Sequence, residues 1–155
     1  MGQSAQTSPD CDTQEMLAAL PSMAKNEWKQ AEDALKSFFY PVCINADGYE
    51  VTLVLERVGP YKNMIMVYIG GQFQGKWIAE DCEERRRFMQ KKVRSLLTPK
   101  QKADYKKLSK RMQKELAQRY HNMEYETYSP QWSSFGALKK HLTTNNQSIR
   151  LIKIG

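Results

Sequence analysis

Fourteen lysine and arginine residues lie between residues 81 and 120, opposed by only five acids, so this stretch carries a net charge of +9. The whole chain of 155 residues carries +7. Clustered cations of this kind bind polyanions, because neutralising phosphates releases the counterions condensed on a nucleic acid. The residues that we expect to make this contact are Arg85, Arg86, Arg87, Lys91, Arg94, Lys107, Lys110, Arg111 and Lys114.

Two other interpretations of the cationic stretch remain open, which are docking on an acidic protein surface and plain solvation of exposed helices. Lysine is a common residue at exposed helix positions because it costs little there. A helix that is merely soluble, however, usually alternates glutamate with lysine to gain pairs four residues apart. Few acids do so here. The imbalance therefore favours a contact with a nucleic acid.

An aromatic segment follows the cationic stretch and includes Tyr125, Tyr128, Trp132 and Phe135. Rings of this kind stack on unpaired bases, each stack contributing about 1–3 kcal/mol in single-strand binders. Tyr128 and Trp132 are the two candidates for such stacking. The alternative, which we favour, is that these rings cover the sheet or the helices and close the core.

No arrangement of residues predicts a reaction. The cysteines and histidines lack the paired spacing of a metal site, and no nucleophile elbow, phosphate-binding loop or dinucleotide-binding motif occurs. Glu80, Asp81, Glu83 and Glu84 sit where a helix would begin, and carboxylates there interact favourably with the helix dipole. We therefore expect a protein that is not an enzyme and that needs no metal or cofactor.

The composition is that of an ordinary globular protein, with 41% hydrophobic and 26% charged residues. Three widely spaced cysteines argue for reduced thiols in the cytosol. Neither a secretory signal nor an apolar run long enough for a membrane span is present. We expect a soluble cytoplasmic protein that avoids membranes, with a flexible tail over residues 1–13 and a single domain over residues 14–155.

The first half of this domain reads as helix followed by strands. A short helix is expected from Thr13 to Leu20, and a longer one capped by Ser22 and ending near Tyr40. The apolar stripe of the longer helix comprises Trp28, Ala31, Leu35 and Phe38. Four strands then follow at residues 42–45, 49–58, 64–69 and 73–78, joined by glycine-containing turns into an antiparallel meander.

The second half reads mainly as helix. One basic helix is expected from Asp81 to about Leu96, and a second from Thr98 to Tyr120, so that the two form an antiparallel pair. A short helix over residues 133–142 and a last strand over residues 148–154 complete the chain. The expected fold is α+β, with an antiparallel meander of four to five strands packed against an N-terminal helix and the basic helical pair.

The C-terminal segment carries the run Tyr128-Ser129-Pro130-Gln131-Trp132-Ser133-Ser134-Phe135, then Leu138-Lys139-Lys140-His141-Leu142 and Asn145-Asn146. These residues resemble the endings of small proteins encoded by bacteriophages and prophages. The resemblance covers about the last thirty residues and transfers no site residue. It implies a cytoplasmic protein of an infected bacterium, in a class where non-enzymatic binders of DNA, RNA or host nucleic-acid enzymes are common.

These observations predict a small binding protein whose basic helical surface contacts nucleic-acid phosphates. The alternative is a phage-type inhibitor or adaptor that binds a host protein, such as a nucleic-acid-processing or defence enzyme. The sequence does not distinguish DNA from RNA, and it does not predict the oligomeric state.

Overall fold

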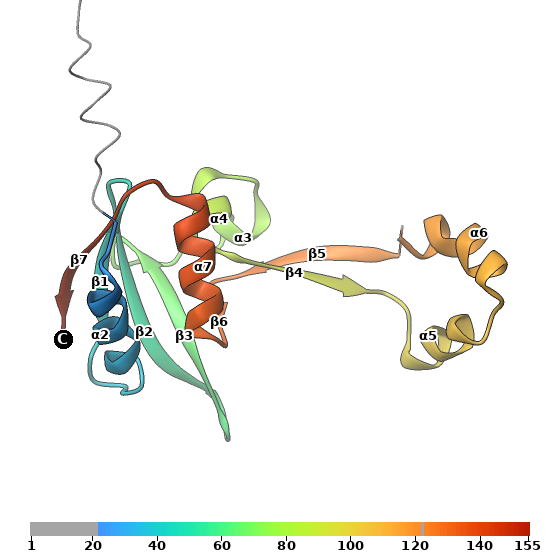
Figure 1. The fold of residues 1–155 in the computed structure, drawn as a ribbon, viewed down its shortest axis with the longest axis horizontal. Helices are drawn as coiled ribbons and strands as arrows, with labels where there is room; N and C mark the ends of the chain where they lie inside the picture. Colours follow the sequence, from blue (N-terminus) through green and yellow to red (C-terminus); the bar gives the residue numbers. More distant parts are fainter. Residues whose placement is uncertain (1–21, 122) are drawn as a thin grey trace, which may run out of the picture.

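The computed structural model describes residues 22–121 and 123–155, so the predicted tail and the predicted helix before Pro21 lie outside the described residues. Figure 1 shows two parts, a body (residues 22–89 and 130–155) and an arm (residues 90–129) that projects from it. In chain order the elements are α2 (Lys25–Ala34), β1 (Val42–Ala46), β2 (Tyr49–Gly59), β3 (Lys62–Ile69), α3 (Lys76–Ala79), α4 (Glu83–Phe88), β4 (Gln90–Ser95), α5 (Pro99–Lys106), α6 (Lys110–His121), β5 (Glu124–Ser129), β6 (Gln131–Trp132), α7 (Phe135–Asn145) and β7 (Ile149–Ile154).

The body is built on a five-stranded antiparallel sheet in the order β6-β3-β2-β1-β7, which confirms the predicted α+β class. The tight turn between β1 and β2 forms as predicted. Asp47 and Gly48 both adopt positive φ angles, of 49° and 92°, the conformation that a two-residue hairpin needs. The last strand also forms as predicted, and it pairs with β1 at the edge of the sheet.

One face of the sheet forms the core. Ile44 pairs with Val51, and Leu53 pairs with Val67, so these side chains lie on the same face, and all four are fully buried. The helices α2 and α7 pack on this face through stripes of side chains three or four residues apart. Those side chains are Trp28 and Ala31 in α2, and Leu138 and Leu142 in α7.

The N-terminal helix is shorter than predicted. Its N-cap is Ala24, whose amide donates to the carboxylate of Glu27 at 2.7 Å, whereas Ser22 forms a bridge to β7 instead of capping. The helix ends at Ala34, and Phe38 is therefore not part of a buried stripe but is 46% exposed. Periodicity alone extended the stripe beyond the point where the chain turns towards β1.

The fourth meander strand predicted at residues 73–78 is wrong. Gly70 and Gly71 have φ angles of 60° and 72° and reverse the chain, and the short helix α3 follows. Within that helix Trp77 is 3% exposed and belongs to the core. The open edge of β3 is taken by β6 instead, which comes from far along the sequence. Burial of the Trp77 indole thus outweighs the strand-like pattern of residues 73–78.

The first helix of the predicted basic pair is also wrong beyond residue 88. The helix α4 ends at Phe88, and residues 90–95 form β4, which pairs antiparallel with β5. The partner strand is rich in tyrosine and threonine and lies about thirty residues further on. Met89, Val93 and Leu96 are spaced as on one face of a helix, but the long-range pairing places Val93 in a strand instead.

The second basic helix is divided in two. Ser109 breaks it by accepting hydrogen bonds from the amides of Met112, through its hydroxyl, and Gln113, through its carbonyl. The Gln113 side-chain amide in turn donates to the carbonyls of Lys106 and Leu108, which end α5. The start of α5 has the predicted capping box, with Thr98 as the N-cap and Gln101 as its partner. Residues 99–121 therefore form two short helices, α5 and α6, in place of the single predicted helix.

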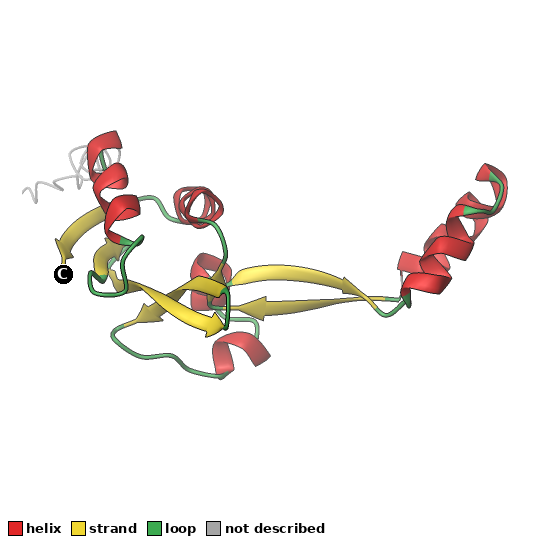
Figure 2. Ribbon diagram, turned by 90° about the horizontal axis from the view of Figure 1, so that it is seen from below, coloured by secondary structure: helices red, strands yellow, loops and turns green. Residues whose placement is uncertain are grey.

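The arm thus consists of a two-stranded ribbon, β4 and β5, that carries α5 and α6 at its end. Figures 1 and 2 show the ribbon leading away from the body and the two helices at its far end. Six paired residues at about 3.3 Å per residue give a ribbon of about 20 Å. We call residues 96–123 the tip of the arm.

Candidate nucleic-acid interface

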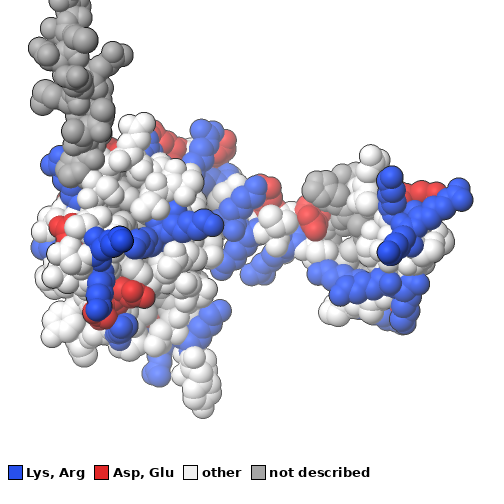
Figure 3. Space-filling model, in the orientation of Figure 1, with Lys and Arg blue, Asp and Glu red and all other residues white. Residues whose placement is uncertain are grey.

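The arm accounts for the whole net charge of the protein. Residues 90–129 contain eleven lysine and arginine residues and four acids, a net charge of +7, whereas the remaining residues contain thirteen of each sign. Figure 3 shows the lysine and arginine side chains along the ribbon and over the tip. The sequence located the charge correctly, but the structure places it on a projection rather than on helices packed against the sheet.

The tip holds eight of these cations and two acids. Two loose pairs form there, Lys107 with Asp104 at 3.5 Å and Arg111 with Glu115 at 3.4 Å, between side chains that are more than half exposed. Pairs of this kind contribute little to stability. Within the described residues, the other six cations of the tip have no ion pair: Lys100, Lys102, Lys106, Lys110, Lys114 and Arg119.

The two faces of the ribbon differ in charge, because neighbours along a strand point to opposite faces. One face, which we call the paired face, holds Lys91 and Glu126, joined by an ion pair of 2.6 Å. Their hydrogen bond raises the pKa of Lys91 and lowers that of Glu126. The opposite face, which we call the cationic face, holds Lys92 and Arg94, neither of which has an ion pair within the described residues.

An arginine on an aromatic ring fixes the root of the arm. The guanidinium carbon of Arg85 lies 3.4 Å from the centre of the Tyr128 ring, on the paired face of β5. Next to it, the indole nitrogen of Trp132 donates to the carbonyl of Phe88 at 3.3 Å. Trp132 is 3% exposed and part of the core. Trp132 is therefore a core residue, as the favoured interpretation expected, and its ring is not exposed for the base stacking considered as the other possibility.

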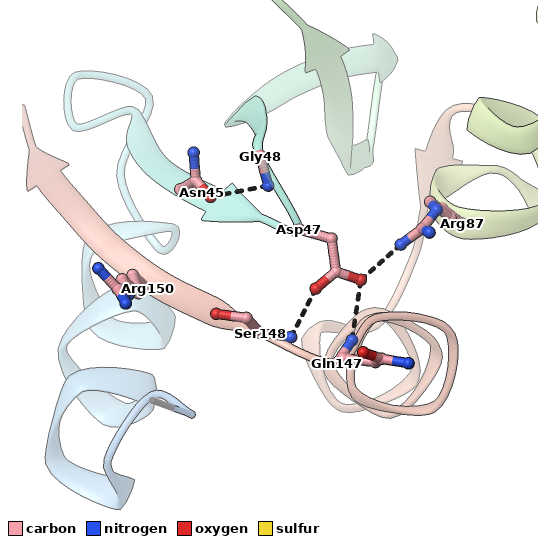
Figure 4. A pocket seen from close by; sticks show the side chains of 7 residues that line it. All are labelled: Asn45, Asp47, Gly48, Arg87, Gln147, Ser148 and Arg150. Carbon is pink, nitrogen blue, oxygen red and sulfur yellow. Dashed lines mark hydrogen bonds and ion pairs between the residues drawn. The ribbon is translucent and has the colours of Figure 1, made fainter. Parts of the chain in front are cut away.

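Arg86 and Arg87 are held in the body by carboxylates. Arg86 forms two hydrogen bonds to Asp81, at 2.9 and 2.6 Å. Arg87 is only 23% exposed and contacts both Glu83 and Asp47. Figure 4 shows Asp47 at the centre of a shallow pocket, where its carboxylate also accepts the amides of Gln147 and Ser148 at 2.9 and 2.6 Å.

This pocket is a structural clamp. Asp47 connects the β1–β2 turn to α4 and to the start of β7, and its oxygens are occupied by the Arg87 guanidinium and two amides. Burial alone would raise the pKa of Asp47, but these hydrogen bonds and the arginine charge outweigh it and lower the pKa. The pKa of Arg87 is raised, since the same partners outweigh its own burial. Arg87 is thus committed to holding the fold.

The predicted site residues are consequently divided among three places. Arg85, Arg86 and Arg87 lie at the body end of the arm, and Arg87 is not available to a phosphate. Lys91 and Arg94 lie on opposite ribbon faces, because a strand alternates where a helix would have aligned them. The tip brings together the remaining four, which are Lys107, Lys110, Arg111 and Lys114.

Sequence reasoning missed other cations of the arm as candidate contacts, namely Lys92, Lys100, Lys102, Lys106 and Arg119. A strand interpretation of residues 90–95 would have placed Lys92 with Arg94, two residues apart. Tyr125 lies directly opposite Arg94 in the ribbon register and is 42% exposed, so it is the aromatic side chain of the cationic face.

The described residues hold no group of three or more histidine, cysteine or acidic side chains placed to bind a metal. Nor does any helix among them have the length and apolar character needed to cross a membrane. The chain matches no protein-family model, no curated protein and no solved structure.

Proposed function

We propose that this protein is a non-enzymatic nucleic-acid-binding protein whose arm contacts phosphates largely without reading sequence. The observation that carries the proposal is that the arm has a net charge of +7, whereas the larger body has thirteen cations and ten acids, a net charge of +3, which the three acids of residues 1–21 offset. Most cations of the tip have no acidic partner within the described residues. Such groups are free to replace the counterions of a phosphate backbone.

The shape of the arm supports the same conclusion. A ribbon of two strands fits the major groove of a duplex, which is about 12 Å wide. We assign the contact to the cationic face, where Lys92, Arg94 and Tyr125 lie together, and to the tip beyond it. The paired face is less suitable, because Lys91 is neutralised by Glu126 and Arg85 is stacked on Tyr128.

Plain solvation accounts less well for this distribution. Exposed cations that serve only solubility need not gather on one projection, yet the arm carries +7 and the larger body only +3. Concentrating like charges on a slender element also costs electrostatic free energy. A binding role explains why that cost is retained.

The test is a titration of fluorescent duplexes and single strands of mixed sequence with the full chain, followed by anisotropy. Binding should weaken steeply between about 50 and 200 mM salt, with little difference between sequences. An affinity that is absent at low salt, or that does not change with salt, would refute the proposal. Comparing DNA with RNA in the same assay identifies the preferred polymer.

A further inference from the structure

The tip of the arm has a second property that phosphate binding does not use, namely an apolar surface without a core. None of the described side chains between residues 96 and 123 is buried. Leu96 is 66% exposed, Met112 48% and Met123 39%. The two helices have eight and twelve residues, and helices of that length are marginal in water without packing. The tip is therefore incomplete as a folded unit.

Two clefts open beside Leu97, between the helices and the end of the ribbon. The larger is about 440 Å³, with Leu97, Tyr105 and Ala117 among its lining residues. The smaller is about 260 Å³, and Leu116 and Met123 contribute to its lining. Apolar clefts of this kind accept side chains rather than phosphates.

The rims of both clefts have an excess of cations. Lys102 and Lys106 border the larger cleft together with one acid, Glu124, and Arg119 borders the smaller one. Within the described residues none of the three cations has an ion pair. A second copy of the chain is a poor occupant, since two tips of charge +6 each would repel one another. Charge complementarity requires an acidic partner.

We propose that the tip of the arm docks an acidic protein segment, whose apolar side chains enter the two clefts while its carboxylates meet Lys102, Lys106 and Arg119. In many peptide complexes, apolar anchor side chains of the peptide fill a groove while charged residues at the rim contact its polar groups, and we infer the same mode here. It does not depend on the proposed nucleic-acid contact, because the apolar side chains that line the clefts take no part in that contact. Only the rim cations Lys102, Lys106 and Arg119 belong to both surfaces.

The probe is a displayed library of random peptides selected on the full chain. Selected peptides should combine aspartate or glutamate with leucine, phenylalanine or tryptophan, and they should shift the backbone amide resonances of residues 97 and 117. Ala117→Phe fills the larger cleft and should weaken the best peptide by about thirtyfold. Gln118→Phe is the matched control, since Gln118 is exposed and lines neither cleft, and it should change affinity less than twofold.

Several results would overturn the inference. These are failure to select any acidic peptide, resonance shifts confined to the body, or equal losses in the two phenylalanine variants. A concentration-dependent dimer abolished by Ala117→Phe would show that a second copy fills the cleft, and competition of duplex for the same cleft would assign it to nucleic acid. Ala117→Phe should leave the affinity for duplex unchanged while it weakens the peptide. That difference separates a failure of this inference from a failure of the proposed function. If the variant tip unfolds, the resonance shifts of the native chain still decide.

Discussion

Removing cations from the tip should lower the salt dependence of nucleic-acid binding by a calculable amount. Lys100, Lys110 and Lys114 are exposed, have no ion pair within the described residues and line neither cleft. Each phosphate contact contributes about 0.9 to the slope of log affinity against log salt on a duplex. The triple glutamine variant should therefore have a slope smaller by up to about 2.7. Between about 50 and 200 mM salt it should lose about 40-fold less affinity than the native chain.

The matched control removes the same charge from the body. Lys62, Lys140 and Lys153 are exposed and have no ion pair within the described residues, and their triple glutamine variant has the same net charge as the tip variant. Anisotropy titrations of both variants over the same salt series provide the comparison. If the two slopes fell equally, net charge and not the arm would govern binding. A tip variant with an unchanged slope would also refute the reasoning.

Three further outcomes follow from the structure. Arg94→Gln should weaken duplex binding in an anisotropy titration, whereas Lys91→Gln should not, because Lys91 is already paired; the reverse order would exchange the two ribbon faces. Asp47→Ala should cost about 2–4 kcal/mol in denaturant unfolding, since the partly buried Arg87 loses its partly buried partner and two amides lose their acceptor. In the native chain the pKa of Asp47 is lowered, so its contribution to stability is complete above the ordinary value of 3.8 and is lost as the pH falls through the lower folded value. A free energy of unfolding that did not change with pH in that range would contradict this. Trp132→Ala should lower the free energy of unfolding by about 3–5 kcal/mol through loss of core packing. A folded Trp132→Phe variant should keep its affinity for single strands in the anisotropy assay. A loss of that affinity would restore the stacking hypothesis.

The body of the protein was largely predictable, because its signals are local. The turn at Asp47 and Gly48 needs two positive φ angles, β1 and β3 are rich in apolar residues, and β2 alternates in burial, so all three strands follow from nearest-neighbour chemistry. The buried stripe of Trp28 and Ala31 is likewise local. The fold class could therefore be predicted before any coordinates were known.

The candidate site was predicted only as a composition. The excess of cations between residues 81 and 120 is visible in the sequence, but their geometry depends on the pairing of β4 with β5. That pairing separates Lys91 from Arg94 and moves α5 and α6 away from the sheet. No local pattern encodes it, because the partner strand begins only at Glu124.

The sequence by itself determined the charge, the α+β class and the short-range turns, since each of these depends on residues that are close together in the chain. Only the tertiary structure decided that the charge projects on an arm, that Arg87 belongs to a clamp with Asp47, and that Trp132 is buried. The physical reason is the same in all three cases. Strand pairing and burial join segments far apart in the sequence, and the free energy gained there outweighs the local helical preference.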